Sequence, residues 1–340
     1  MKAIVLNKTG GPEVLVPIEV AESKPGKGEV SIKIEYAGIN YAEILSRKGL
    51  YGWAVKRPYI LGMEASGVID SLGPGVKNLE SGQKVMLGTK SGAYAERIVV
   101  PEERVTPVLE NYTMEENASF LVNYMTAWVS LVKMAKISSE DKVLITAAAG
   151  GVGTAAVQIA SRYGCMVYGM AGSEEKINLI KSLGATDGYN YRDPDCFKRL
   201  MEDVGGVDVV LEMVGGKVFK ESMDIVNPFG RVVVAGFASL DLKKWNPVSW
   251  IKTWKDIPRV SIGDLAKKSV AVMSSHLGYL LEDEPKHMEK ILRDLTEFVQ
   301  KYDIKPIIGK VFQFEDASEA HRYIESRQST GKVLLNIGDS

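Results

Sequence analysis

The chain contains little cysteine and little histidine, and these scarcities exclude several kinds of protein. Two cysteines, Cys165 and Cys196, occur in 340 residues; they are too few for a disulfide framework and lack zinc-finger spacing. The three histidines, His276, His287 and His321, are scattered, and no group of His, Cys and Glu residues has the spacing of metal ligands. The sequence therefore predicts no metal site, and the scarcity of cysteine favours a reducing, cytoplasmic compartment.

An excess of charge of one sign and a long apolar segment are absent as well. The 42 Lys and Arg residues nearly balance the 43 Asp and Glu residues, which leaves no basic surface for nucleic acid. The N-terminal MKAIVLNK has too few apolar residues for a signal peptide. Residues Val143–Ser161 carry no charge, but their three glycines cluster at a turn, so we expect a buried strand and helix and no transmembrane segment. Without a G-x-S-x-G motif, we expect the chemistry to come mainly from a bound cofactor.

The pattern of apolar residues predicts two domains. Short strands separated by glycine and proline turns occupy the first 110 residues, as at Lys2–Leu6 and Glu29–Ala37. From about Ser119, apolar strands alternate with amphipathic helices, which is typical of a doubly wound parallel sheet. Its strands are expected at Val143–Thr146, Met166–Met170, Val207–Glu212 and Arg231–Phe237. We predict an α/β protein with a β-rich domain at residues 1–122, completed by 299–340, and a Rossmann domain at 123–298.

The most informative stretch is KVLITAAAGGVGTAAVQIAS, at Lys142–Ser161. A strand enters a glycine-rich turn and a helix follows at once, so that free N–H groups and the positive end of the helix dipole favour a phosphate there. Gly150 then admits the close approach of a pyrophosphate, and Gly153 the close packing of helix on strand. Ala148 replaces the first glycine of the usual G-x-G-x-x-G, and a turn without a ligand is the alternative. The residues expected at the dinucleotide are Ala149, Gly150, Gly151, Val152 and Gly153.

The residues about 20 positions beyond these glycines favour NADPH over NADH. An NAD-specific Rossmann fold carries there an acidic residue that bonds the ribose 2′-hydroxyl. This chain has Gly172 and Ser173 instead, followed by Lys176. A hydroxyl and a lysine suit the 2′-phosphate of NADPH, which a carboxylate would repel. Tyr191 and Arg192 add a stacking ring and a second cation, whereas a solvated Lys176 on the helix surface is the alternative.

Residues 239–268 depart from the alternating pattern. They contain Trp245, Trp250 and Trp254 among lysines, as do segments that lie on a membrane surface. A lid or an interface insert with internally packed aromatic residues is the other interpretation, because Pro247 and Pro258 interrupt the segment.

Several motifs follow one another in the order found in a known family. The chain resembles the medium-chain dehydrogenase/reductase superfamily in its zinc-independent quinone oxidoreductase (zeta-crystallin) branch. Within that branch, LVNYMTAW (Leu121–Trp128) and SSHLGYLLE (Ser274–Glu282) are similar to the vesicle amine transport protein homologues. The motifs are AGIN-Y (Ala37–Tyr41), GLY (Gly49–Tyr51), LGMEASGVI (Leu61–Ile69), GAYAE (Gly92–Glu96), AAAGGVGTAAVQ (Ala147–Gln158), KSLGA (Lys181–Ala185) and GKVLL (Gly331–Leu335).

The resemblance implies a GroES-like β-rich domain beside the Rossmann domain, and it assigns roles to individual residues. The zinc-dependent relatives carry their ligands where this chain has Asn40, Met63 and Val122, so the resemblance also predicts that zinc is absent. Asn40 would border the nicotinamide, and Tyr51 would line the substrate pocket. The other residues implied at the cofactor are Thr126, Ser173, Lys176, Tyr191, Phe237, Ala238, His276, Leu277 and Arg327. On residue type alone, Tyr51 as a core aromatic and Asn40 as a turn residue stay open.

The reaction implied is hydride transfer from NADPH to a small-molecule quinone or α,β-unsaturated carbonyl compound. Tyr51 is the candidate hydroxyl for the product oxygen, and Asn40 and the ribose hydroxyl are the alternatives. An enoyl-thioester reductase of fatty-acid or polyketide type shares the scaffold, and a nucleotide-binding protein with little turnover and a membrane-surface role is the third hypothesis. We also expect a homodimer formed through the last Rossmann strand, around Ala271–Ser275, because an exposed apolar edge strand invites pairing. A monomer whose insert covers its own edge is the alternative.

Overall fold

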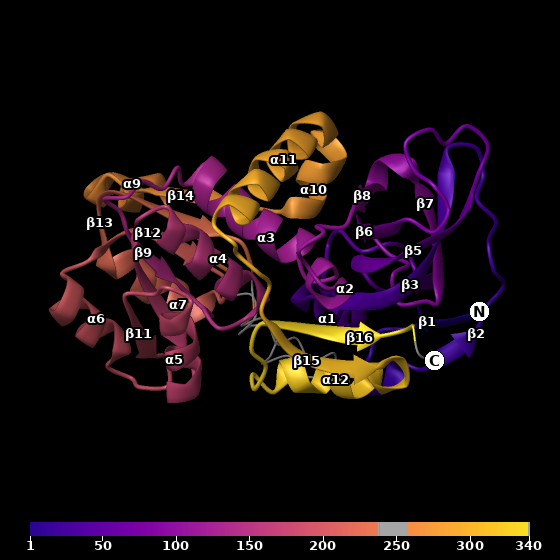
Figure 1. Cartoon of the computed structure of the whole chain (residues 1–340). Helices are drawn as coiled ribbons and strands as arrows, with labels where there is room; N and C mark the ends of the chain where they lie inside the picture. Colours follow the sequence, from indigo (N-terminus) through magenta and orange to yellow (C-terminus); the bar gives the residue numbers. More distant parts are fainter. Residues whose placement is uncertain (237, 239–256, 339–340) are drawn as a thin grey trace. The chain divides into compact units, whose positions relative to one another are not determined.

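The computed structural model describes residues 1–236, 238 and 257–338, and these form two compact units (Figure 1). The β-rich unit comprises Met1–Val122 and Lys305–Ser340, and the Rossmann unit comprises Asn123–Ile304. The sequence placed the second boundary at residue 299, six residues too early. The Rossmann unit continues further because helix α11 (Pro285–Lys301) extends past that point. Ile304 is also buried, with its N–H bonded to the Val299 carbonyl at 2.9 Å.

The β-rich unit is built around the long strand β3 (Glu29–Ile39). Seven strands form one sheet in the order β15-β16-β3-β5-β6-β8, with β7 also paired to β3, and a smaller sheet has the order β2-β1-β4. The tail completes the unit because β16 (Lys332–Asn336) pairs antiparallel with β3, with Val333 opposite Ile39 (Figure 1). The other strands are β1 (Lys2–Leu6), β2 (Pro17–Glu19), β4 (Tyr59–Ile60), β5 (Glu64–Leu72), β6 (Lys84–Gly88), β7 (Arg97–Pro101), β8 (Val105–Pro107) and β15 (Ile308–Gln313).

Alternating apolar residues put the core of this unit on one side of the strands. Val30, Ile32 and Ile34 of β3 are buried, and Phe314 packs with them in the same cluster. At roughly 25 cal/mol for each Å² of apolar surface, such burial is the main stabilising contribution to the unit. Three helices, α1 (Tyr41–Lys48), α2 (Met114–Asn117) and α12 (Ala317–Glu325), complete it, together with 3₁₀ turns at Pro12–Val14, Glu102–Arg104 and Phe314–Asp316.

The Rossmann unit contains a six-stranded parallel sheet in the order β11-β10-β9-β12-β13-β14. This order confirms the predicted doubly wound sheet. Successive strands are added on one side of β9 as far as β11 and then on its other side from β12 onward, so the strand order reverses between β9 and β12. Its strands are β9 (Lys142–Ile145), β10 (Met166–Ala171), β11 (Asp187–Asn190), β12 (Val207–Glu212), β13 (Val226–Val234) and β14 (Ala271–Ser274). Its helices include α4 (Gly151–Arg162), α5 (Glu174–Ser182), α6 (Cys196–Val204), α7 (Gly216–Ile225), α9 (Ile262–Lys268), α10 (Leu277–Asp283) and α11. Helix α3 (Leu121–Trp128) precedes them and continues as a π-helix at Val129–Met134.

Two features of this sheet refine the prediction. Strand β13 begins at Val226, five residues before the predicted start, and its register with β12 shifts near Val207, while Phe229 adopts a positive φ of 64°. At the edge of the sheet, β14 pairs with β13 alone within the described parts of the chain. No helix among the described residues is long and apolar enough to cross a bilayer.

Candidate functional site

The glycine-rich turn leads from β9 into α4 at the carboxyl end of the parallel sheet. Helix α4 begins at Gly151 with Gly150 as its N-cap, and no described side chain caps it. A Cβ at Gly153 would lie 2.4 Å from the Ala147 carbonyl oxygen, and one at Gly151 would lie 2.6 Å from Nδ2 of Asn123. Gly153 therefore requires glycine, because its Cβ would meet backbone atoms, whereas a side chain at Gly151 would displace the Asn123 amide.

Gly150 differs, and the difference fits a phosphate. Its φ of −81° is open to any residue, and a Cβ there would meet Ala147 O at 3.4 Å, an ordinary contact among the described atoms. The fold does not demand glycine at this position, whereas a ligand that approaches the backbone closely does. An uncapped helix N-terminus at the point where the sheet reverses direction is where a Rossmann fold holds a pyrophosphate. Ala149–Gly153 thus fit the dinucleotide.

A cationic pair lies at the ends of β10 and β11. The Ser173 hydroxyl caps α5 and accepts the Lys176 N–H at 3.4 Å. The Tyr191 ring covers Gly172 so closely that a Cβ there would lie 2.6 Å from the Tyr191 hydroxyl. Partial burial and the nearby Arg192 charge lower the pKa of Lys176. Neighbouring cations of this kind repel each other and pair favourably with anions.

The remaining residues predicted at the cofactor lie after later strands of the same sheet or on α3. The Ala238 N–H donates to the Met213 carbonyl at 3.0 Å, which ties the chain after β13 to the loop after β12. His276 caps α10, and its Nδ1 accepts the Tyr279 N–H at 3.3 Å. Burial lowers the pKa of His276 and so favours the neutral ring.

Other predicted residues are placed as follows. Thr126 is nearly buried on α3, and Leu277 is the first residue of α10. Phe237 lies outside the described residues, as do the three tryptophans of the 239–268 segment; of that segment the structure describes residues 257–268, which include α9.

Glu212 is a residue of this edge that the sequence analysis did not identify. Its carboxylate is fully buried at the end of β12 and accepts the N–H groups of Val214 at 2.8 Å and Gly215 at 3.0 Å. Burial raises the pKa of this carboxyl. The arrangement fixes the loop that leads into α7. The sequence signal for it was an acidic residue at a strand end followed by M-V-G-G.

In the β-rich unit, Asn40 is held at the start of α1. Its backbone N–H donates to Glu43 Oε2 at 2.8 Å, and its Nδ2 donates to Glu43 Oε1 at 3.4 Å. The same Oε1 accepts the Met63 N–H at 3.0 Å. Burial, offset in part by the charge of Lys332, raises the pKa of Glu43 to about 7. The spacing Asn40-x-x-Glu43 is typical of a helix N-terminus and could have indicated this contact.

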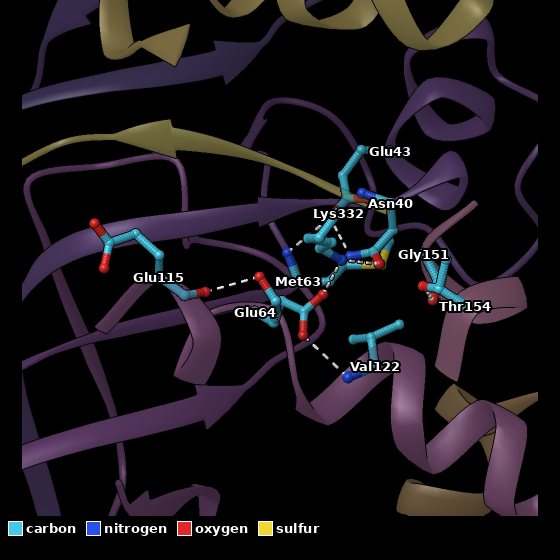
Figure 2. Close-up of polar contacts among 10 residues, drawn as sticks. Asn40, Glu43, Met63, Glu64, Glu115, Val122, Gly151, Thr154 and Lys332 are labelled. Atoms are coloured by element: carbon cyan, nitrogen blue, oxygen red, sulfur yellow. Dashed lines mark hydrogen bonds and ion pairs between the residues drawn. The ribbon is translucent and has the colours of Figure 1, made fainter. Parts of the chain in front are cut away.

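A buried ion pair completes this cluster (Figure 2). The Lys332 ammonium donates to Asn40 Oδ1 at 2.6 Å and to Glu64 Oε1, and both charged side chains are buried. The other Glu64 oxygen accepts the Val122 N–H at 3.0 Å. Glu64 and Lys332 stand inside the motifs LGMEASGVI and GKVLL, but nothing in the sequence alone indicated their pairing.

The positions that hold zinc ligands in the zinc-dependent relatives do not fit a zinc ion here. The Asn40 oxygen is engaged by an ammonium group, and the Met63 and Val122 side chains offer a thioether and an alkyl group. Within the described parts of the chain, no group of three or more His, Cys, Asp and Glu residues is arranged to hold a metal. A buried cation, the Lys332 ammonium, lies among these positions.

Tyr51 and Arg327 also belong to the β-rich unit. The half-buried Tyr51 follows α1, and its ring meets Trp53 edge-on at a centroid distance of 6.4 Å. Arg327 follows α12 with a positive φ of 59°, and its N–H donates to the Ile324 carbonyl at 3.0 Å. The predicted residues are therefore divided between the units, with Asn40, Tyr51 and Arg327 in the β-rich unit and the others described in the Rossmann unit.

Comparison with known proteins identifies the family. The profile "Alcohol dehydrogenase GroES-like domain" matches residues 26–110, and "Zinc-binding dehydrogenase" matches residues 151–294. The synaptic vesicle membrane protein VAT-1 homolog of Rattus norvegicus is 33% identical over 92% of this chain and 78% of its own length. Quinone oxidoreductase of Sus scrofa is 30% identical over 98% of this chain and 97% of its length. The structure of Escherichia coli quinone oxidoreductase complexed with NADPH superposes with a TM-score of 0.87, at 28% identity over 99% of this chain and all of that one. The chain belongs to the medium-chain dehydrogenase/reductase superfamily, among the relatives of the VAT-1 homologues and quinone oxidoreductases.

Proposed function

We propose that this protein is a zinc-independent, NADPH-dependent reductase of small quinones or α,β-unsaturated carbonyl compounds. The observation that carries the proposal is the cationic pair Lys176 and Arg192 beside the Ser173 hydroxyl, at the strand ends where a Rossmann fold binds the adenosine ribose. Family membership gives the oxidoreductase scaffold, and this pair supports the choice of cofactor.

The charges at this position favour NADPH on electrostatic grounds. Glu174 and Glu175 stand in the first turn of α5, where the helix dipole favours acidic residues, and both are exposed. Burial and the nearby charge of Arg192 lower the pKa of Lys176, and a phosphate dianion beside these two cations would relieve their repulsion. A ribose 2′-hydroxyl would leave the repulsion in place.

When bound, NADPH would supply a hydride, and this chain would orient the reactants and stabilise the charge that follows. Ala149–Gly153 would hold the pyrophosphate on backbone N–H groups. The product of hydride arrival is an enolate or a hydroquinone anion, which needs a hydrogen-bond donor and a proton. We assign Asn40 the donor role and Tyr51 the role of proton donor, with solvent able to reprotonate a quinone product.

The cofactor preference is tested by Lys176→Ala. Loss of one charge-assisted contact costs about 1.5–3 kcal/mol, so we expect NADPH to bind roughly tenfold or more weakly while NADH binding is unchanged. The matched control is Lys181→Ala, on the same helix, where the ammonium pairs with Asp187 at 3.0 Å on the surface. Equal affinity of the unaltered protein for NADPH and NADH in fluorescence titrations would contradict the preference.

The acceptor class is tested by NADPH oxidation with three probes: 1,2-naphthoquinone, cyclohexenone and crotonyl-CoA. We expect turnover with the first two. Turnover with crotonyl-CoA alone would favour the enoyl-thioester reductase instead, and no turnover with any probe would leave the nucleotide-binding protein with a membrane-surface role.

A further inference from the structure

The ammonium group of Lys332 is one of the buried charges of the β-rich unit, since it lies at the start of β16 with only 2% of the residue exposed. Burying an ammonium is unfavourable unless its donors are engaged. Here one donor goes to Asn40 Oδ1 and another to Glu64, while Glu64 also receives the Val122 N–H. The cluster is thus built around this cation.

Gly38 shows that the strands make room for it. A Cβ at Gly38 would lie 2.7 Å from Cε of Lys332 and 2.8 Å from Cγ of Glu64. Gly38 stands opposite Glu64 across β3 and β5, and β16 pairs with the same part of β3. A side chain at this position would therefore meet the Lys332 and Glu64 side chains as well as the Ala118 carbonyl oxygen, which lies 2.7 Å from the same Cβ position.

This cation fixes how the Asn40 amide is oriented. An ammonium group has donors and no acceptor, so the amide must present its oxygen to Lys332 and cannot present its nitrogen. Nδ2 is then directed away from Lys332, with Glu43 Oε1 at 3.4 Å from it. Since Nδ2 carries two hydrogens and this contact uses one, the other hydrogen is left as a donor among the described residues.

We propose that Lys332 is a positioning residue for the reduction: it locks and polarises the Asn40 amide so that its Nδ2–H donates to the acceptor oxygen. The inference rests on the proposed function.

As a hydride with its electron pair arrives at the acceptor carbon, the electron pair of the C=O π-system passes to oxygen, which becomes anionic until a proton from Tyr51 or solvent neutralises it. The positive charge of Lys332 on Asn40 Oδ1 makes the Nδ2–H a stronger donor to that oxygen. In this interpretation a lysine supplies part of the electrostatic stabilisation that a metal supplies elsewhere in the superfamily.

The experiment uses the full chain and removes the cation with little change of shape. Lys332→Met alone would strand the Glu64 carboxylate in the interior and can prevent folding. The test variant is therefore Lys332→Met combined with Glu64→Gln, which neutralises both partners. Lys77→Met, at an exposed position of the same unit, is the matched control.

We expect the double variant to bind NADPH as the unaltered protein does and to lose about tenfold or more in kcat with 1,2-naphthoquinone and cyclohexenone, since removal of one oxyanion donor costs about 10²–10³-fold in other enzymes. The kinetic isotope effect with 4-deuterated NADPH should rise, because hydride transfer becomes slower relative to release. A general loss of folding would lower the bound cofactor as well as kcat, and melting curves would report it directly.

Asn40→Ala distinguishes positioning from any other role of Lys332. If the lysine acts through Asn40, neutralising Lys332 and Glu64 in an Asn40→Ala background should cause no further loss of kcat. Full additivity of the two losses would overturn the inference, and so would unchanged kcat and isotope effect in a folded Lys332→Met, Glu64→Gln variant. Absence of turnover by the unaltered protein with every acceptor would instead overturn the proposed function, and this inference with it.

Discussion

The buried His321 makes the stability of the β-rich unit depend on pH in a way that can be calculated. Its imidazole lies on α12 with no exposed surface, and its Nε2 is 3.4 Å from the Tyr94 hydroxyl. Within the described parts of the chain, Nδ1 has no hydrogen-bond partner. Burial, together with the nearby charge of Arg47, lowers the pKa of His321 to about 3.

The sign and size of the effect follow from the two pKa values. In the unfolded chain His321 takes up a proton near pH 6.5, whereas in the folded chain it resists protonation down to about pH 3. Between these values the unfolded state binds the extra proton, so the free energy of unfolding falls as the pH falls. Each pH unit in this window costs about 1.4 kcal/mol, which gives roughly 2 kcal/mol at pH 5 and about 4–5 kcal/mol at pH 3.

The assay compares the unaltered protein with His321→Phe, which keeps a ring edge-on to Tyr94, where the centroids are 6.1 Å apart. Urea titrations at pH 7 and pH 5 give the change in unfolding free energy for each protein. We expect the unaltered protein to lose about 2 kcal/mol more than the variant. The raised pKa of Glu43, about 7, makes the free energy of unfolding fall as the pH rises from 4.5 to 7. Because Glu43 is present in both proteins, this contribution cancels when the two are compared. His287→Phe, at an exposed position of α11, is the matched control. An equal pH-dependent loss in the unaltered protein and His321→Phe would refute the reasoning.

Two further predictions concern the metal and the assembly. Dialysis against a strong chelator should leave both turnover and melting temperature unchanged, since the Lys332 ammonium engages the Asn40 oxygen and the Met63 and Val122 side chains are poor zinc ligands; stoichiometric zinc that leaves together with activity would contradict this. Light scattering at low micromolar concentration should give a mass near twice the 37.2 kDa of one chain. The reason is that β14 has a strand partner on one side only within the described residues, which leaves an edge for a second copy. A mass near 37.2 kDa would favour the monomer.

The Rossmann sheet was predictable because its signals are local. Around the glycine-rich turn, a buried strand, three glycines and an amphipathic helix follow one another within twenty residues. In the structure they form β9, the turn and α4. The start of β13 was not predictable in the same way. Val226–Phe229 carry turn-forming residues and a positive φ at Phe229, and they count as strand only because Val226 pairs with Val207 of β12.

The cluster around Lys332 was beyond prediction for a related reason, which also explains why it is sensitive to small changes. Its members lie up to 292 residues apart and meet through the register of three strands, with Val333 opposite Ile39 and Gly38 opposite Glu64. A slip of one residue in β16 would turn Lys332 to the other face of the sheet and leave the Glu64 carboxylate buried without its cation. The buried pair thus penalises the wrong register of the C-terminal tail, and the contact that we propose orients Asn40 for the reduction also favours the correct closure of the β-rich unit.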